Sequence, residues 1–337
     1  MKKAKVIIPY LAAFLLAVGA WAQAGAPLQL VKTVPLPGLH GRDFDHFTAD
    51  PASDRLFSAA EEYHKVLVFN LQGKLLHTIS DVKAPHSLLY RDDQKKLYVI
   101  DSDLGGVKIY DGVTYKPVGF IKTRLGADSS NYDPATQTLY VITGGFDVKM
   151  KHAYLTAIDT NTEKIIKSVP IDSDNVEAIE FDNASPRMFV MVRGNHAVEV
   201  FNRHTLQRLA TWPLGPKAAC SAVVFDAADH RLLIGSRSPG TLWLVNSDTG
   251  QVINSQKAPE MVDDIAYNAA KNQIYYLGTE KLEVYQRQDA DHWNPVASIP
   301  TGYRAKTGTF VPQVNRLYVG VAEHGKSSAK VLIFKDR

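Results

Sequence analysis

The most regular feature of the chain is an alternation of apolar and polar positions that recurs seven times. In each recurrence an aromatic or small residue precedes by seven positions the aliphatic residue that opens an apolar run. Successive recurrences are offset by 41, 42, 49, 44, 42 and 43 residues, close to the roughly 40–45 residues of a four-stranded propeller blade. The pattern therefore predicts an all-β, seven-bladed β-propeller. The seven pairs are Ala49 and Leu56, Tyr90 and Leu97, Tyr132 and Leu139, Phe181 and Met188, Phe225 and Leu232, Tyr267 and Ile274, and Phe310 and Leu317.

Each repeat contains the material for four strands. An inner strand ends at the aromatic or small residue, and the aliphatic run supplies a second strand. A third, alternating run such as 66–70 or 107–111 ends in Asp or Asn, which favours a turn, and a weaker outer strand such as 75–79 follows. The extra length of the third repeat falls around residues 144–152.

The two ends of the chain are predicted to meet in one blade. The last repeat stops at Arg337 directly after its third strand, whereas residues 28–35 form a strand-like segment with no inner strand before it. We expect residues 28–35 to be the outer strand of the last blade, because this pairing leaves no open edge in the ring. Without a long helical period or a linker-like tract, residues 25–337 are predicted to form one domain.

The first 24 residues have the composition of a secretory signal peptide. Three lysines precede an apolar stretch at residues 6–18, and small-residue cleavage sites follow at 20–22 or 22–24. Thirteen apolar residues are too few to cross the roughly 30 Å of a bilayer core. The sequence therefore predicts residues 1–24 as a signal peptide, a periplasmic or secreted protein, and no membrane span after cleavage.

Charge and cysteine content narrow the functional classes. The chain has 38 Lys and Arg against 35 Asp and Glu, and three of the lysines belong to the predicted signal peptide. The mature protein is formally neutral, which disfavours nucleic acid and anionic membranes as partners. Cys220 is the only cysteine, so no intrachain disulfide is possible, and a buried thiol is expected.

Several second-strand segments carry a recognisable motif. Residues 97–99, 139–141 and 317–319 each read Leu-Tyr-Val, and Tyr132-Asp133-Pro134 precedes one of them. These segments resemble the YVTN-repeat propellers, although the Thr-Asn half of that motif is largely absent. The resemblance covers the predicted mature chain and implies an exported bacterial seven-bladed propeller. Its motif is structural, so it implies no catalytic residue and no cofactor.

Polar residues gather at one end of the predicted inner strands. The residue four positions before each aromatic or small anchor is polar in every repeat, whereas the residue two positions later is mostly apolar. Because inner strands of a propeller line its central channel, these side chains are predicted to surround one mouth of the channel. They are Asp45, His86, Asp128, Glu177, Ser221, Asp263 and Lys306, with His46, Asp264 and Thr307 beside them.

This ring supports more than one chemistry. The four carboxylates of Asp45, Asp128, Glu177 and Asp263 could hold a divalent cation, the one cofactor that the pattern suggests. The alternative is that a wet channel simply carries polar side chains. Loops after the second strands add charged residues to the same face: Glu61, Glu62, His64, Asp101, Asp103, Asp147, His152, Arg193, His196, Arg237, Glu323, His324 and Lys326.

No catalytic motif accompanies the ring. Residues 320–327 match the P-loop pattern G-x-x-x-x-G-K-S, but a strand pattern at 330–334 follows instead of the helix that a phosphate-binding loop requires. The leading hypothesis is an exported monomeric protein that binds a small molecule or a protein partner at Asp45, His46, His86, Asp128, Glu177, Asp263 and Lys306, and the absence of catalytic motifs favours a binding role over an enzymatic one. The alternatives are a metal-dependent hydrolase of the lactonase or esterase type, whose known propellers usually have six blades, and a protein that binds single-stranded nucleic acid.

Overall fold

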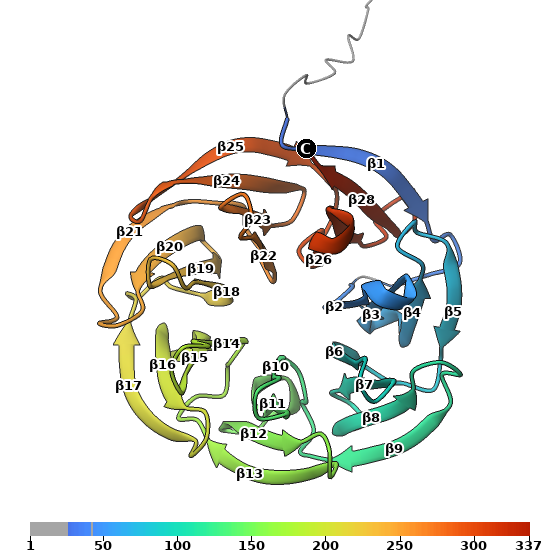
Figure 1. Cartoon of the computed structure of the whole chain (residues 1–337), viewed down its shortest axis with the longest axis horizontal. Helices are drawn as coiled ribbons and strands as arrows, with labels where there is room; N and C mark the ends of the chain where they lie inside the picture. Colours follow the sequence, from blue (N-terminus) through green and yellow to red (C-terminus); the bar gives the residue numbers. More distant parts are fainter. Residues whose placement is uncertain (1–25, 42) are drawn as a thin grey trace, which may run out of the picture.

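The computed structural model describes residues 26–41 and 43–337, which form a ring of seven four-stranded antiparallel sheets around a central channel (Figure 1). The predicted signal peptide lies outside the described residues. No helix in the described part of the chain is long and apolar enough to cross a membrane. The all-β, seven-bladed prediction is confirmed.

The strands of each blade run in chain order from the channel outwards in blades 1 to 6. Blade 1 is β2 (Phe47–Asp50), β3 (Arg55–Ala60), β4 (Lys65–Phe69) and β5 (Leu75–Ile79). Blade 2 is β6 (Pro85–Arg91), β7 (Lys96–Asp101), β8 (Gly106–Asp111) and β9 (Pro117–Lys122). Blade 3 is β10 (Ser130–Asp133), β11 (Thr138–Gly144), β12 (Ala153–Asp159) and β13 (Lys164–Pro170). Blade 4 is β14 (Ala178–Phe181), β15 (Arg187–Val192), β16 (Ala197–Asn202) and β17 (Gln207–Pro213).

The remaining blades are built in the same way, with one exception at the end of the ring. Blade 5 is β18 (Cys220–Asp226), β19 (Arg231–Arg237), β20 (Gly240–Asn246) and β21 (Val252–Lys257). Blade 6 is β22 (Ile265–Asn268), β23 (Gln273–Leu277), β24 (Lys281–Asp289) and β25 (His292–Pro300). Blade 7 is β26 (Gly308–Val311), β27 (Arg316–Val321), β28 (Lys330–Asp336) and, as its outer strand, β1 (Leu28–Pro35). Five one-turn 3-10 helices lie in the described loops: η1 (Pro51–Ser53), η2 (Glu61–Tyr63), η3 (Phe146–Val148), η4 (Arg193–Asn195) and η5 (Pro312–Val314).

The constant spacing of seven residues is the register of the inner hairpins. In all seven blades the two residues of the repeat pair face each other directly across the first two strands, as Tyr132 faces Leu139. Six of the hairpins turn through a residue with positive φ two positions before the aliphatic partner, such as Asn272. Blade 4 has Pro186 there, whose ring holds φ near about −65°. One hairpin geometry thus generates the sequence period.

The ring closes as the sequence predicts. Strand β1 pairs antiparallel with β28, from Leu28 opposite Asp336 to Pro35 opposite Lys330. Its apolar side chains enter both neighbouring interfaces, since Leu28 packs between blades 6 and 7 and Val34 packs between blades 7 and 1. The outer edge of the last blade is therefore covered by the start of the described chain (Figure 1).

The hydrophobic core is divided among the blade interfaces. The described residues form seven apolar clusters, and each cluster joins residues of two adjacent blades. Cys220 lies fully buried in the cluster between blades 4 and 5, where burial raises the pKa of its thiol to about 12. The predicted buried thiol is confirmed, and stability rests on face-to-face packing of the blades.

Two local predictions can also be compared with the structure. Residues 320–327 begin in β27 and continue into a loop before β28, so the helix of a phosphate-binding loop is absent from this described segment. The extra length of the third repeat forms the loop between β11 and β12, which contains η3. That loop projects an exposed Phe146 beside the channel, where it contributes to the candidate site.

Candidate functional site at the channel mouth

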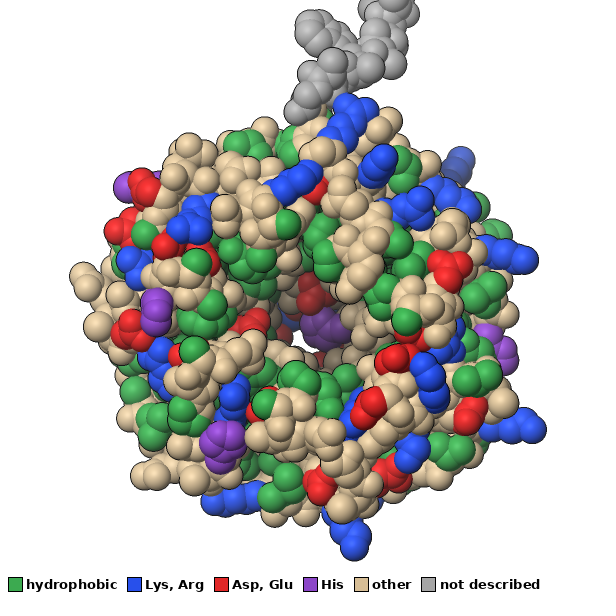
Figure 2. Space-filling view, in the orientation of Figure 1, with side chains coloured by type: hydrophobic (Ala, Val, Ile, Leu, Met, Phe, Trp, Pro, Cys, Tyr) green, Lys and Arg blue, Asp and Glu red, His purple; other side chains and the backbone are tan. Residues whose placement is uncertain are grey.

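One end of the channel opens into a cavity of about 770 Å³, which we call the channel-mouth cavity. Residues from all seven blades line it, and the space-filling view shows acidic and histidine side chains in the depth of the central hollow (Figure 2). The seven polar residues predicted from the repeat all lie on its wall. The predicted residues thus surround one mouth of the channel.

Backbone pairing fixes where these side chains point. Each predicted residue lies just where the chain enters an inner strand, and several are already hydrogen-bonded to the second strand of their blade. The Asp45, Asp128 and Glu177 amides donate to carbonyls of their own second strands at 2.9, 3.0 and 3.0 Å. The ring is therefore held by the sheets themselves, whereas Glu61 and Arg193 reach the cavity from the one-turn helices η2 and η4.

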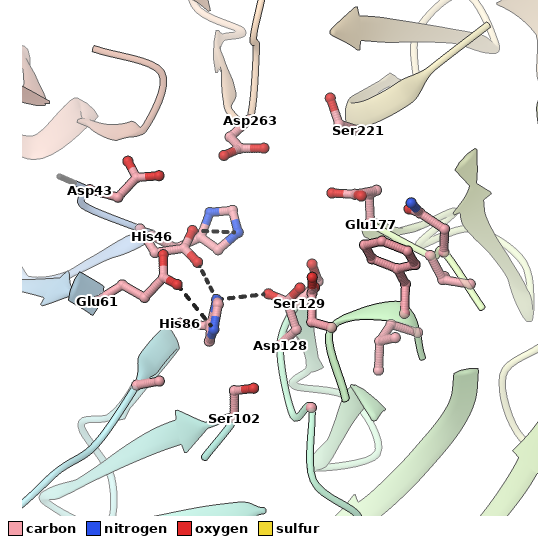
Figure 3. Close-up of a pocket in the computed structure, with 18 of the residues that line it drawn as sticks. Asp43, His46, Glu61, His86, Ser102, Asp128, Ser129, Glu177, Ser221 and Asp263 are labelled. Atoms are coloured by element: carbon pink, nitrogen blue, oxygen red, sulfur yellow. Dashed lines mark hydrogen bonds and ion pairs between the residues drawn. The ribbon is translucent and has the colours of Figure 1, made fainter. Parts of the chain in front are cut away.

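Two histidines connect the carboxylates of blades 1 to 3. His86 places Nδ1 2.6 Å from Asp45 Oδ2 and 3.2 Å from Asp128 Oδ1, while its Nε2 lies 3.6 Å from Glu61 Oε1 (Figure 3). His46 places Nε2 3.4 Å from the other oxygen of Asp45. We call Asp45, His46, Glu61, His86 and Asp128 the histidine-bridged half of the cavity.

Asp264 of blade 6 extends this chain of groups, although it is not among the residues that line the cavity. Its Oδ1 lies 2.9 Å from His46 Nδ1, and its Oδ2 accepts a hydrogen bond of 2.9 Å from the Gly308 amide. Carboxylates and imidazoles therefore alternate in the order Asp264, His46, Asp45, His86 and Asp128.

The electrostatic environment favours charged imidazoles in this half. Burial opposes a proton on His46, but Asp264 and Asp45 outweigh it and raise the pKa of His46 to about 10. Burial likewise opposes a charge on His86, yet Asp128 and Asp45 raise the pKa of His86 well above its usual value. Burial favours the neutral form of Asp45, but His46 and His86 lower the pKa of that carboxyl well below its usual range. Burial raises the pKa of Glu61 to about 7.

The carboxylates of the opposite half are matched by permanent cations. Glu177 pairs with Arg193 at 3.0 Å and with Arg237 at 3.3 Å. Asp263 contacts both Arg237 and Lys306. Seven lining residues make up what we call the cation-paired half: Asp43, Glu177, Arg193, Arg237, Asp263, Arg304 and Lys306.

Asp43 is the most deeply placed acid of the cation-paired half. Its Oδ2 lies 3.0 Å from Arg304 and 3.3 Å from Lys306, and its residue exposure is 5%. Burial raises the pKa of Asp43 in spite of the two cations. Ser221, the uncharged member of the predicted ring, donates a 2.6 Å hydrogen bond to the Val262 carbonyl and so bridges blades 5 and 6.

The cavity as a whole is acidic and has one apolar side. Ten carboxylates line it against four Lys and Arg side chains, so the charged histidines do not restore neutrality. Phe146 and Val148, both in η3, add apolar surface to the lining, and Phe146 is 66% exposed. A ligand that carries positive charge and some apolar surface matches this lining.

The structure sorts the predicted site residues into groups. Asp45, His46, His86 and Asp128 lie together, whereas Glu177, Asp263 and Lys306 belong to the cation-paired half. The four carboxylates considered for a cation are therefore not gathered around one point. Of the predicted loop residues, the structure places seven on the cavity wall: Glu61, Glu62, His64, Asp103, Asp147, Arg193 and Arg237.

Three charged residues of the cavity wall, Asp43, Asp174 and Arg304, are not among the predicted residues, and one predicted loop acid lies elsewhere. Asp43 and Arg304 occupy the same repeat position, six residues before their anchors, and reading that position would have found them. Asp101 is fully buried and accepts hydrogen bonds from the Lys83, Ala84 and Leu104 amides. It shapes the chain between blades 1 and 2 and does not present charge to the cavity.

Known proteins share the architecture of the chain but not its sequence. No family model and no curated protein matches, so the resemblance to YVTN-repeat propellers stays a prediction. The structure of U3-55K is similar with 14% identity and a TM-score of 0.73, covering 92% of this chain and 98% of that one. The WD40 repeats of RRP9 give 14% identity and a TM-score of 0.75, covering 93% and 98%.

A third structure matches to a similar degree. A chain of Kuenenia stuttgartiensis hydrazine synthase gives 13% identity and a TM-score of 0.72, covering 85% of this chain and 96% of that one. At these identities the likeness establishes the fold alone, because one fold serves many unrelated functions. The function has to be argued from the channel-mouth cavity.

Proposed function

We propose that the protein is a binding protein whose channel-mouth cavity takes a small, positively charged organic molecule. The observation that carries this proposal is the excess of ten carboxylates over four Lys and Arg side chains around one cavity. Its volume of about 770 Å³ lies within the roughly 300–1,000 Å³ of small-molecule sites. A cation entering the cavity would reduce the repulsion among these carboxylates.

The two halves of the cavity would contribute differently to binding. In the cation-paired half Glu177 and Asp263 already contact arginine or lysine, so their charge is largely used within the protein. Among the described residues Asp128 faces His86 at 3.2 Å and interacts electrostatically with His46, and both are titratable, which leaves that carboxylate better able to accept an ammonium group. The apolar body of the ligand would contact Phe146 and Val148, and the Phe146 ring could add a cation–π interaction.

The other hypotheses receive less support from the cavity. A protein partner would have to insert a projecting basic segment, because the lining is concave. The hydrolase hypothesis placed a metal on Asp45, Asp128, Glu177 and Asp263, which do not converge, and it stays a prediction. An acidic mouth repels phosphates, so single-stranded nucleic acid is disfavoured there for a local reason in addition to the neutral net charge.

We also propose that the cavity works outside the cytoplasm. The support is the lysine-rich start, the short apolar stretch and the small-residue sites within residues 1–24. Expression of the full chain in a Gram-negative host, followed by fractionation and mass measurement, should give a periplasmic or secreted product that starts near residue 25. A cytoplasmic product of full length would contradict the proposal.

Thermal unfolding with three ligands that share a six-carbon chain tests the binding proposal. Hexylamine is a cation at neutral pH, hexan-1-ol is neutral and hexanoate is an anion. We expect the amine to raise the Tm, by roughly 2–5 °C at a hundredfold excess over its Kd, and the other two to have no effect. Equal shifts with all three, or a shift with hexanoate alone, would overturn the proposed charge preference.

A pair of apolar variants tests where the chain of the amine lies. Phe146→Ala should weaken hexylamine binding several-fold, because it removes the aromatic side of the cavity. Val113→Ala is the matched control: Val113 is 65% exposed, like the 66% of Phe146, but does not line the channel-mouth cavity. Equal affinities for both variants and the wild type would place the ligand elsewhere.

A further inference from the structure

Two serine hydroxyls on the wall of the channel-mouth cavity have no partner in the described part of the protein. Ser102 and Ser129 are 8% and 6% exposed, and neither hydroxyl has a hydrogen-bond partner among the described residues. Ser58 also has an unpaired hydroxyl, but its oxygen is enclosed by protein, whereas the oxygens of Ser102 and Ser129 are open to the cavity. Because buried polar groups are nearly always hydrogen-bonded, these two hydroxyls indicate a partner that enters from the cavity.

Asp128 adds a charged acceptor to the two serines. It precedes Ser129 just before β10, and its side chain is 31% exposed. Its Oδ1 lies 3.2 Å from His86, whereas its Oδ2 has no partner within hydrogen-bond distance among the described residues. Ser102 is held on the same side of the cavity, because its carbonyl accepts a 3.0 Å hydrogen bond from the Gly126 amide, two residues before Asp128 (Figure 3). We call Ser102, Asp128 and Ser129 the three-acceptor group.

The apolar part of the lining begins next to the three-acceptor group. Gly126 lies so close to Val148 that a Cβ atom added to the glycine would be 2.9 Å from Val148 Cγ2. Val148 and Phe146 both belong to η3, and both line the cavity. Phe146 is the only Phe, Tyr or Trp among the described residues of the lining. The described wall thus offers hydrogen-bond acceptors and apolar surface, but not the cage of several aromatic rings that binds quaternary ammonium groups.

We propose that the ligand of the cavity is a primary amine, whose –NH₃⁺ group binds the three-acceptor group while its apolar chain contacts Val148 and Phe146. The inference rests on the proposed binding function and specifies the class of cation. A primary ammonium has three N–H donors, and Asp128 and the two serines supply one acceptor each. Each methyl group on the nitrogen removes a donor, so a trimethylammonium group would leave both hydroxyls without a partner. Ser102 and Ser129 are therefore specificity-determining residues.

Three cations that share a six-carbon chain test the proposal on the unmutated protein. Hexylamine has three N–H donors at neutral pH, N,N-dimethylhexylamine has one and hexyltrimethylammonium has none. Calorimetric titration should rank the affinities in that order, with hexylamine binding about tenfold more tightly than hexyltrimethylammonium, because hydrogen bonds to charged groups are the stronger ones. Equal affinities for the three cations, or tightest binding of hexyltrimethylammonium, would overturn the assignment of a primary amine.

A matched pair of serine variants tests the residues themselves. Ser129→Ala should weaken hexylamine binding about three- to tenfold and leave the affinity for hexyltrimethylammonium unchanged. Ser221→Ala is the control, because Ser221 also lines the cavity but its hydroxyl already donates to the Val262 carbonyl at 2.6 Å. If both variants bind hexylamine as tightly as the wild type, the role of Ser129 is wrong. Absence of any hexylamine binding to the wild type would instead contradict the proposed function, so the two failures can be told apart.

Discussion

The two halves of the channel mouth are both lined by carboxylates, but the groups that balance the charge of these carboxylates differ. Both are built from carboxylates at the beginning of inner strands. In the cation-paired half Asp263 contacts Arg237 and Lys306, which carry permanent charge. In the histidine-bridged half Asp45 contacts two imidazoles, whose charge depends on protons. The first half is neutralised by the fold, whereas the second can exchange its protons for another cation.

This difference explains how one polar ring can serve both stability and binding. A buried carboxylate needs a counter-charge, and a lysine or arginine supplied by the chain satisfies that need permanently. An imidazole supplies this counter-charge only while it is protonated. When the histidine is neutral, the carboxylate beside it can bind another cation. The residues that matter for folding should therefore lie mainly near Asp263, and the residues that matter for the ligand near Asp128 and Glu61.

The largest expected effect is the loss of a permanent cation. Lys306 is 6% exposed and contacts Asp43 and Asp263. Lys306→Met should lower the free energy of unfolding by about 3 kcal/mol, because two buried carboxylates lose a partner. Chemical denaturation measures this. The exposed Lys217→Met is the control and should change stability by less than about 0.5 kcal/mol. If Lys306→Met lowers the free energy of unfolding no more than Lys217→Met does, the proposed difference between the two halves is wrong.

A smaller effect should appear in the pH dependence of stability. The pKa of His46 is raised in the folded protein to about 10, so its stabilisation is complete below the unfolded value of about 6.5 and is lost as pH rises through 10. Between pH 7 and 10 the wild type should lose roughly 1–3 kcal/mol relative to His46→Gln. Denaturant unfolding at several pH values checks this, and parallel profiles for the two proteins would contradict it.

The smallest effect is expected at the uncharged member of the ring. Ser221 is 3% exposed and donates to the Val262 carbonyl at 2.6 Å. Ser221→Ala should cost about 1 kcal/mol, the usual value for one buried hydrogen bond, at every pH. It should leave hexylamine binding unchanged because no charge is altered. A clear change in hexylamine affinity would show that the division into two halves is too simple.

The fold could be predicted because one local geometry is repeated. Ala49 and Leu56, like the other six pairs, are direct cross-strand neighbours, so the hairpin register is written into the sequence as a constant spacing. The closing strand 28–35 could be predicted because one blade lacked an outer strand. Both inferences rest on the pairing of neighbouring strands within a blade. Because the blade recurs seven times, each inference can be checked against the other blades.

The cavity could be located, but its chemistry could not be read from the sequence. The repeat indicated the positions of Asp128 and Glu177, but not which of them faces a histidine and which faces arginines. Those pairings depend on loops such as η2 and η4, which bring Glu61 and Arg193 over the mouth from outside the repeat. Side-chain partners across the channel are tertiary contacts between residues far apart in sequence, as His46 and Asp264 illustrate.

The most direct test of the central claim is a crystal structure of the wild-type protein grown with hexylamine. The account predicts electron density for the amine in the channel-mouth cavity, with its nitrogen within hydrogen-bond distance of a carboxylate of the histidine-bridged half and its chain against Phe146. Density on the outer surface of the ring alone, or a nitrogen beside the arginines of blades 4 and 5, would contradict it.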